Sequence, residues 1–197
     1  MKKIILVVLF VAAMLGLGLL LFKFSNQNPA GQAATEADPV KNDFSHVPTG
    51  GQLLGNLKKA SLDALNAEGN VLHIHQHLDI IINGQQIAIP ANIGVGGGFI
   101  SPIHTHDGSG ILHVESPVKK DFTLGQFFKE WNVDLSDKQI GNNVVDDARK
   151  LIVGVNGSTV ENPSDYVLKE HDEIEIWYGK KDENPTLIKD YKFPAEL

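Results

Sequence analysis

The spacing of apolar and polar residues divides the chain into four parts. Residues 4–22 carry no charge, whereas the next thirty or so residues have little apolar content and neither a helix nor a strand period. From Leu53 to about Gly179 the apolar positions recur at helical or strand spacing, which is the main sequence signal of regular structure. The pattern predicts a hydrophobic segment over 1–23, a flexible linker over 24–52, one folded domain over 53–180 and an irregular tail over 181–197.

Within the domain the spacing predicts two helices and a series of strands. Leucines at near-helical spacing from Leu53 to Leu65 indicate an amphipathic helix that ends at Gly69. Thr123 is an N-cap residue for a second helix over 124–131, whose leucine and aromatic side chains fall on one stripe. Apolar runs, several of them alternating, predict strands over 72–82, 85–89, 103–106, 111–115, 151–155 and 173–178.

The order of these elements indicates the fold class. Asn83-Gly84 joins the first two strands and is a strong short-range signal of a tight β-hairpin, because both turn positions need positive φ. Hairpins come first, the helix over 124–131 follows, and further strands come last. This order predicts an α+β domain with a mixed or antiparallel sheet and a helix packed on one face.

The strand over 72–82 carries histidines on one face. Its even positions are apolar except for Gln76, whereas its odd positions include His73, His75 and His77. Because successive side chains of a strand point to opposite faces, the three imidazoles share one side of the sheet. They extend too far along a regular strand to reach one ion together. Two of them would therefore complete a neighbouring site, form a second one, or let a metal pass between weak positions.

Three further histidines are predicted to converge on the second hairpin. If its Asp-Gly-Ser-Gly segment is the turn, antiparallel pairing sets His104 opposite His113, and His106 lies on the same face. Imidazoles at these spacings are close enough to bind one ion as a three-histidine site. Glu115 shares that face and Asp107 borders the turn. Either carboxylate is a candidate fourth ligand, catalytic base or partner that orients an imidazole.

The composition narrows the choice of metal. Imidazole is the commonest side-chain ligand for transition metals, and six of the eight histidines fall in these two clusters. The chain has no cysteine, and both of its methionines, Met1 and Met14, precede or lie within the hydrophobic segment. Soft ligands for Cu(I) are therefore absent from the domain. We predict a site for Zn(II) or Cu(II), with the candidate ligands His73, His75, His77, His104, His106 and His113.

Two alternatives need no metal. The histidines would form a hydrogen-bonded structural layer, or a contact surface that responds to pH because imidazole titrates near neutrality. Single histidines are usually ordinary core or surface residues. We apply that interpretation to His46 in the linker and to His171 in an acidic turn.

The uncharged N-terminal segment predicts a membrane anchor. Its nineteen residues match the ~20 that a spanning helix needs and exceed the ~7 to 15 of a signal peptide's apolar region. Lys2 and Lys3 precede it, which favours a cytoplasmic N-terminus and an extracytoplasmic domain on the cell membrane. Cleavage of a signal peptide near Ala33 or Ala34 is the alternative.

The charge excludes one class of partner. The chain has 17 basic and 24 acidic residues and a net charge of −7. Without the lysines at positions 2, 3 and 23, the rest carries 14 basic against 24 acidic residues, a net charge of −10. Such a surface repels nucleic acid and attracts cations. We expect a metal ion and the membrane as partners and leave a protein partner open.

Two sets of motifs resemble known groups of proteins. Thr123-Leu-Gly-Gln-Phe-Phe, Gly154-Val-Asn-Gly157 and the ending over 168–179 resemble β-grasp domains of the ubiquitin-like and sulfur-carrier type, over about a third of the chain. The diglycine tail of a sulfur carrier is missing, so the resemblance implies the fold and not carrier activity. His-x-His-x-His-Leu, with Ser-Pro-x-His-Thr-His-Asp and Ile-x-His-Val-Glu-Ser, resembles uncharacterised membrane-anchored bacterial proteins, which implies no particular activity.

Three functions are compatible with these observations. The first is a membrane-anchored extracytoplasmic protein that binds Zn(II) or Cu(II). The second is a metalloenzyme of hydrolase or hydratase type, in which three histidines leave a position for an activated water and Glu115 or Asp107 is the base. The third is a β-grasp interaction module with structural histidines. The sequence contains no nucleophile elbow, P-loop, dinucleotide fingerprint or zincin helix, so we favour the first.

Overall fold

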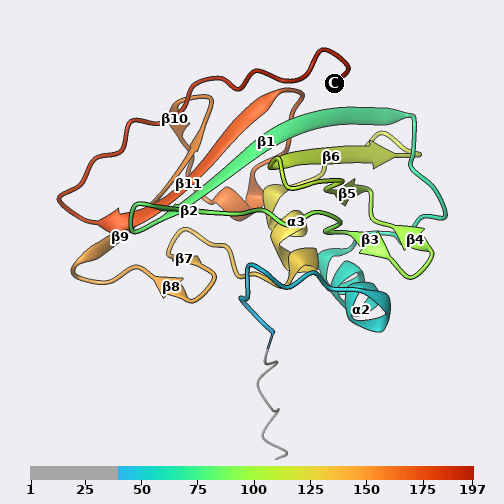
Figure 1. Cartoon of the computed structure of the whole chain (residues 1–197), viewed down its shortest axis with the longest axis horizontal. Helices are drawn as coiled ribbons and strands as arrows, with labels where there is room; N and C mark the ends of the chain where they lie inside the picture. Colours follow the sequence, from blue (N-terminus) through green and yellow to red (C-terminus); the bar gives the residue numbers. More distant parts are fainter. Residues whose placement is uncertain (1–39) are drawn as a thin grey trace, which may run out of the picture. The chain divides into compact units, whose positions relative to one another are not determined.

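A mixed seven-stranded sheet is the centre of the computed structural model, which describes residues 40–197 (Figure 1). The predicted anchor over 1–23 and the first part of the predicted linker lie outside the described residues. Among the described residues, no helix is long and apolar enough to span a bilayer. The described residues form one compact unit.

Strand β1 (Leu72–Ile82) holds the sheet together because it pairs with three other strands. Its N-terminal half is antiparallel to β6 (Ile111–Ser116), and its C-terminal end is antiparallel to β2 (Gln85–Ile87). Along its other edge it is parallel to β11 (Asp172–Lys180). The sheet is completed by β9 (Arg149–Val155) and β10 (Ser158–Thr159) beyond β11, and by β5 (Ile103–His104) beyond β6.

Short elements connect these strands. The glycine-rich segment before β5 contains a two-stranded hairpin, β3 (Val95–Gly96) with β4 (Phe99–Ile100). A second small hairpin, β7 (Gln139–Ile140) with β8 (Asn143–Val144), and a 3-10 turn, η1 (Pro163–Asp165), precede and follow β9. Mixed strand pairing with helices on the sheet confirms the predicted α+β class.

The Asn83-Gly84 turn between β1 and β2 confirms the hairpin expected from the sequence. Asn83 has a φ of 52° and Gly84 a φ of 78°. Two consecutive positive φ angles are the requirement of the type I′ turn that Asn-Gly favours. The turn also defines which face of β1 each side chain occupies, because a shift of one residue would exchange the two faces.

Helix α3 (Leu124–Trp131) coincides with the predicted range. Thr123 accepts a hydrogen bond from the backbone N–H of Gln126, and the Gln126 side chain accepts one from the backbone N–H of Thr123. This reciprocal capping box satisfies two N–H groups that have no partner within the helix.

Helix α2 (Gly50–Ala60) is shorter at its C-terminal end than predicted. Instead of continuing towards Gly69, it stops where Ser61 adopts the left-handed conformation with a φ of 56°. The N–H groups of Ser61 and Leu62 donate to the carbonyls of Lys58 and Leu57, as in a Schellman motif. Leu57 and Leu62, at the two ends of this motif, are both buried in the apolar core, and the helix stops without a glycine.

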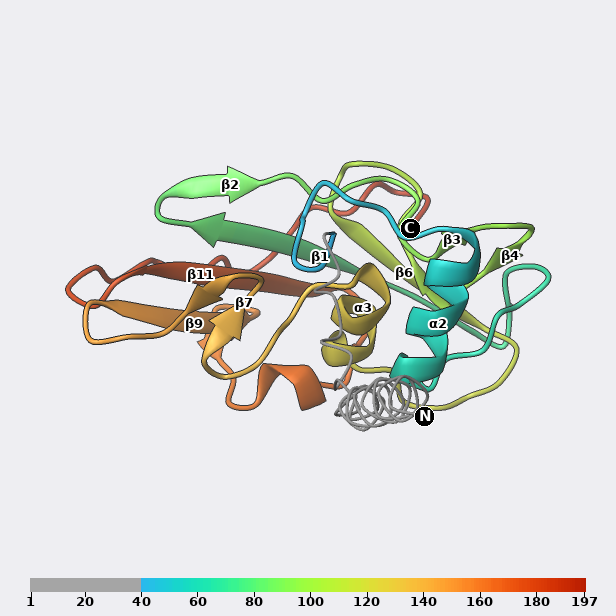
Figure 2. The same cartoon turned by 90° about the horizontal axis from the view of Figure 1, so that it is seen from below.

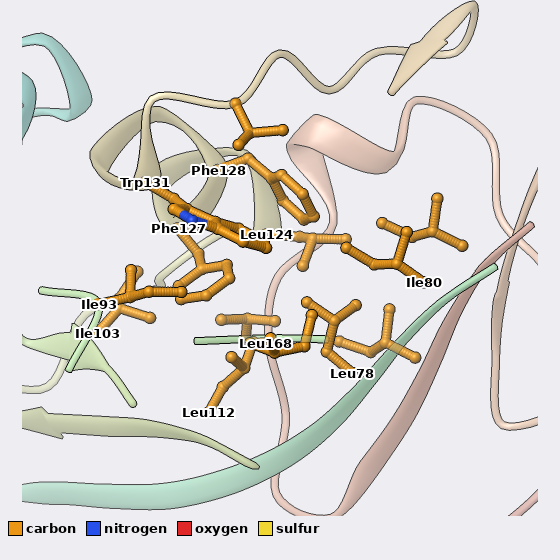
Figure 3. Packing of buried hydrophobic residues seen from close by; sticks show 14 of the residues in the cluster. Leu78, Ile80, Ile93, Ile103, Leu112, Leu124, Phe127, Phe128, Trp131 and Leu168 are labelled. Atoms are coloured by element: carbon orange, nitrogen blue, oxygen red, sulfur yellow. The ribbon is translucent and has the colours of Figure 1, made fainter. Parts of the chain in front are cut away.

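The two helices cover one face of the sheet and enclose the apolar core (Figures 1 and 2). This is the face to which the even-numbered residues of β1 point. Figure 3 shows the helix side chains lying over the sheet side chains within this cluster; those labelled from α3, β1 and β6 are Leu124, Phe127, Phe128, Trp131, Leu78, Ile80 and Leu112. Full burial of such side chains contributes roughly 1.5 to 3 kcal/mol each.

Residues 40–49, expected in the linker, pack on the domain. The ring of Phe44 meets Trp131 edge-on with 5.6 Å between ring centroids. The Trp131 indole N–H donates to the carbonyl of His46 at 3.2 Å. The folded part therefore begins earlier in the chain than the apolar periodicity indicates.

The opposite face of the sheet is polar, and the C-terminal segment over 181–197 runs along it (Figure 1). This segment has no regular secondary structure, yet the Ile188 N–H donates to Glu175 at 2.9 Å and the Tyr191 ring stacks on His77. The predicted tail is thus irregular but packed. The histidines lie on this polar face.

Candidate metal centre

The register of three strands brings five histidines and one glutamate together. In the pairing of β1 with β6, His73 lies opposite Glu115 and His75 lies opposite His113. In the pairing of β5 with β6, His104 lies opposite His113, as the hairpin argument expects. His106 follows two residues after His104. We refer to His73, His75, His104, His106, His113 and Glu115 as the histidine cluster.

The first half of the histidine cluster is formed by β1 and β6. The Nε2 atoms of His73 and His75 are 3.1 Å apart. Glu115 Oε1 lies 3.1 Å from His73 Nε2 and 3.5 Å from His113 Nδ1. Each of these four residues offers a ligand atom within 4.8 Å of the others, so the half-cluster has the size of a metal coordination shell.

The second half lies on β5 and the segment after it. His104 Nε2 and His106 Nε2 are 3.2 Å apart, and His104 Nε2 is 4.0 Å from Glu115 Oε2. His104 and His106, together with His113 and Glu115, form a second group within 4.8 Å. His106 is exposed, and its Nε2 lies 3.6 Å from Glu68 at the rim.

Hydrogen bonds of the Thr105 side chain hold the backbone between His104 and His106 in place. Thr105 lies between them and is fully buried. Its hydroxyl donates to the carbonyl of Pro90 at 2.9 Å and accepts from the N–H of Ile93 at 3.0 Å. These bonds hold the segment in place beyond the last paired residue of β5, which explains how His106 keeps its place beside His104 without strand pairing.

The hydrogen bonds of His104 define its tautomer. Its Nδ1 lies 2.9 Å from the carbonyl oxygen of Ser101, which only accepts, so Nδ1 carries the proton. In the neutral ring Nε2 then presents a lone pair to the cluster. Metal-bound histidines have this arrangement, with the second ring nitrogen donating to a carbonyl or carboxylate.

The spacing of the nitrogen pairs matches tetrahedral coordination. With zinc–nitrogen bonds of about 2.0 to 2.1 Å, two ligands of a tetrahedral ion are about 3.3 to 3.4 Å apart. The two Nε2 pairs, at 3.1 and 3.2 Å, require only small adjustments to reach that separation. The buried clusters are therefore geometrically able to bind a metal ion.

Burial keeps the inner histidines neutral at pH 7. Loss of hydration, and secondly the neighbouring imidazoles, lowers the pKa of His104 to about 4 and that of His113 to about 3. Burial and the nearby His73 also lower the pKa of His75. Burial, reinforced by Glu68, raises the pKa of Glu115. Neutral imidazole is the form that ligates metals, so no proton has to leave these three rings when an ion binds.

His77 lies apart from the histidine cluster, although it shares the face and the strand. Parallel pairing with β11 places it beside Glu173, and its Nδ1 is 2.8 Å from Glu173 Oε2 and 3.8 Å from Asp79. Its Nε2 lies 3.1 Å from the carbonyl of Ser109. His77, Asp79 and Glu173 form a third group of potential ligands, separate from the other two.

The surroundings of His77 favour a protonated ring. Both of its nitrogens face acceptors, and an imidazole donates twice only as a cation. Burial by itself lowers the pKa of His77, but the hydrogen bond and charge of Glu173 outweigh it, and the pKa is raised. Gly110, with a φ of 86°, allows the backbone to approach this ring, since a Cβ there would lie 3.1 Å from His77 Nε2. We refer to His77 with Glu173 as the His77 pair.

Asp107, a candidate base on sequence grounds, does not join either group. Its carboxylate accepts from the backbone N–H of Ser109 at 2.9 Å within the exposed turn, and the hydrogen bonds from the side chain and the backbone of Ser109 lower its pKa. Glu115, the other candidate, lies inside the histidine cluster. His46 and His171 stand outside all three groups, where His46 contacts Gln52 and His171 stacks on Phe193.

Several contacts at the site could not be expected from the sequence. Glu68 lies in a loop, and nothing in its spacing connects it with His106. Glu173 belongs to a predicted strand, but only the parallel register places it beside His77. Comparison of the chain with known protein families, curated proteins and solved structures found no match.

Proposed function

We propose that this protein binds a divalent transition metal ion, Zn(II) or Cu(II), through the histidine cluster. The observation that carries the proposal is the convergence of neutral imidazole nitrogens with a buried carboxylate from three neighbouring strands. A structural histidine layer would satisfy its ring nitrogens with hydrogen bonds, and both Nε2 pairs are close enough for N–H···N bonds. The buried Nδ1 of His113 has no hydrogen-bond partner, and this favours a cation in the cluster over a fully hydrogen-bonded layer.

The donor set limits the choice of ion. Imidazole and carboxylate suit zinc and Cu(II), and the chain has no cysteine to favour Cu(I) or an iron–sulfur cluster. Magnesium and calcium prefer sites made of oxygen ligands. Zn(II) and Cu(II) are then distinguished by geometry, because Cu(II) prefers tetragonal and zinc tetrahedral coordination.

We place this metal-binding domain outside the cell, on a membrane anchor formed by residues 1–23. The support is the uncharged stretch of nineteen residues after two lysines, together with a net charge of −10 for the rest of the chain. An acidic domain close to a membrane would concentrate metal cations at its surface. The role is then to buffer the ion or to transfer it to another protein.

We further propose that the domain is a modified β-grasp. The support is the arrangement of β2, β1, β11 and β9 in the sheet, with β1 parallel to β11 and α3 between the first hairpin and the last two strands. The hairpin formed by β5 and β6 is then an insertion that brings His104, His106 and His113 to the N-terminal half of β1.

Elemental analysis tests the metal proposal. The full chain, produced in medium supplemented with zinc and copper and purified in detergent, is expected to contain at least one Zn(II) or Cu(II). The triple variant His104→Ala, His106→Ala, His113→Ala, which keeps only His73, His75 and Glu115 of the cluster, is expected to contain less metal than the wild type. A double variant at His46 and His171, which lie outside the cluster, is the matched control. If the wild-type protein contained no metal, a structural or pH-sensing role of the histidines would be favoured instead.

A metalloenzyme is a second candidate function, because solvent reaches the rim of the histidine cluster. The side chains of His73 and His106 are 52% and 44% exposed, so water can reach an ion bound between them. A bound ion with an open position lowers the pKa of water to ~7 and supplies hydroxide. The test is hydration of carbon dioxide and cleavage of activated esters by the zinc-loaded protein. Rates equal to those of the triple variant would exclude this function.

A further inference from the structure

We propose that the histidine cluster binds two metal ions bridged by the carboxylate of Glu115. This inference rests on the proposed metal-binding function and specifies the form of the site. One ion lies between His73, His75 and His113, and the other between His104 and His106. Glu115 provides one carboxylate oxygen to each of the two ions.

The grouping of ligand atoms is the first argument. The six residues form two overlapping groups that have His113 and Glu115 in common, and the two histidine pairs fall in different groups. Opposite ligands of one ion are separated by at most about 4.2 Å, twice a zinc–nitrogen bond. All ligand atoms of one group lie within 4.8 Å of one another, and neither group contains both histidine pairs. In this arrangement a single ion cannot be bound by both pairs.

The orientation of Glu115 is the second argument. Its Oε1 is 3.1 Å from His73 Nε2, on the side of the first pair. Its Oε2 is the oxygen near His104 Nε2, at 4.0 Å, on the side of the second pair. The two oxygens of one carboxylate therefore face two different sets of imidazoles. Bridging of two ions about 3.5 to 4 Å apart is a common use of such a carboxylate.

His113 supplies the third argument. The ring is 9% exposed, and its buried Nδ1 has no hydrogen-bond partner. A buried nitrogen without a partner costs free energy that a ligand would recover. This Nδ1 lies 3.5 Å from Glu115 Oε1, which assigns it to the ion between His73 and His75. That ion then has three imidazoles and one carboxylate oxygen, a complete tetrahedral set.

The second ion has a more open environment. His104, His106 and Glu115 Oε2 provide three ligands. Glu68, 3.6 Å from His106 Nε2 and half-exposed, lies where it could balance charge or complete the shell after a rotation of its side chain. We expect this ion to bind more weakly and exchange faster than the first.

Metal stoichiometry with copper spectroscopy tests the two-ion site. Metal-free full chain in detergent is titrated with Zn(II) by calorimetry and, separately, with Cu(II) by electron paramagnetic resonance. We expect two Zn(II) per chain. We also expect a half-field signal from two coupled Cu(II) ions. The variants His73→Ala with His75→Ala, and His104→Ala with His106→Ala, should each bind one ion and show the uncoupled spectrum.

Glu115→Gln tests the bridge itself. Gln cannot bridge two ions through two oxygens, so copper coupling should disappear even if both ions bind. Circular dichroism and thermal melting establish that each variant is folded, and the variant at His46 and His171 serves as the control. Two uncoupled ions in the wild type would overturn the bridge. A single ion would overturn the inference and leave metal binding intact, whereas no ion at all would overturn the proposed function as well.

Discussion

His75 and His77 are two residues apart on the same face of β1, but their rings are in opposite electrostatic environments. On the side of β6, His75 meets other imidazoles, and burial with the nearby His73 lowers its pKa. On the side of β11, His77 meets Glu173, which raises its pKa. Alternation along a strand thus groups residues by face, whereas the neighbouring strands decide whether the pKa of a histidine is lowered or raised.

The strongest test of this comparison replaces the histidines on the β6 side and the histidine on the β11 side in separate variants. Replacing His75 and His113 by Gln should lower metal affinity by more than ~100-fold, because two of the proposed ligands are lost. Replacing His77 by Gln should leave the affinity within about threefold, since its nitrogens already face Glu173 and Ser109. Competition against a chelator of known affinity measures both. Equal losses in the two proteins would place His77 in the metal site.

Breaking the His77 pair should reduce stability by about 1 to 3 kcal/mol. Glu173→Ala removes the carboxylate that raises the pKa of His77, so burial returns the ring to its neutral form and leaves Nδ1 without its hydrogen-bond partner. The double variant His77→Leu with Glu173→Leu removes both charges and should recover most of the loss. Urea unfolding of metal-free protein gives the free energies of unfolding. A double variant as unstable as Glu173→Ala would contradict the ion pair.

Removing the metal should lower the stability of the protein through the histidine cluster and leave the contribution of the His77 pair unchanged. At a free metal concentration of ~100 times Kd, binding adds about 2.7 kcal/mol per site to the free energy of unfolding. A strong chelator should therefore lower the Tm of wild type and of His77→Gln by the same amount. It should not change the Tm of a variant in which all five histidines of the histidine cluster are replaced by Ala. A chelator effect on that variant would indicate metal bound elsewhere.

In metal-free protein the two sides should respond to pH with opposite signs. The folded-state pKa of His113 is about 3, below its ordinary value of 6.5, so its contribution to stability is complete above pH 6.5 and declines as the pH falls. Between pH 6.5 and 5 the loss is about 2 kcal/mol, at 1.36 kcal/mol per pH unit. The pKa of His77 is raised, so its contribution is complete below pH 6.5 and declines as the pH rises through the raised value.

Unfolding of His113→Gln and His77→Gln at pH 5, 6.5 and 8 measures this difference. Relative to wild type, His113→Gln should gain stability on acidification, and His77→Gln should gain stability on going to alkaline pH. Parallel pH curves for the two variants would show that the rings do not differ in protonation.

The C-terminal segment should have the smallest effect. The Tyr191 ring stacks on His77 with 3.7 Å between centroids and an interplanar angle of 4°. Tyr191→Ala should therefore reduce the free energy of unfolding by about 1 kcal/mol, the usual contribution of such a pair. Ile188→Ala, in the same segment and already 39% exposed, is the control. Metal content should be unchanged in both variants.

Local features of the fold were predictable from the sequence because their physics is local. The Asn83-Gly84 turn needs two positive φ angles, and α3 begins at a side-chain cap that lies within three residues of its partner. The end of α2 was predicted wrongly, since Ser61 took the left-handed position usually given to glycine. Leu57 and Leu62, at the two ends of this turn, are both buried in the core that the helices share with the sheet, and that environment is not visible in the local sequence.

By itself, the sequence determined that the histidines of β1 share one face and that His104 lies opposite His113, because side-chain alternation and a short turn depend only on neighbours along the chain. Only the tertiary structure decided which rings meet. The antiparallel pairing with β6 joined His73 and His75 to His113 and Glu115, and the parallel pairing with β11 joined His77 to Glu173. A parallel neighbour comes from a distant part of the chain, and its register is selected by burial of the whole apolar face rather than by any local signal.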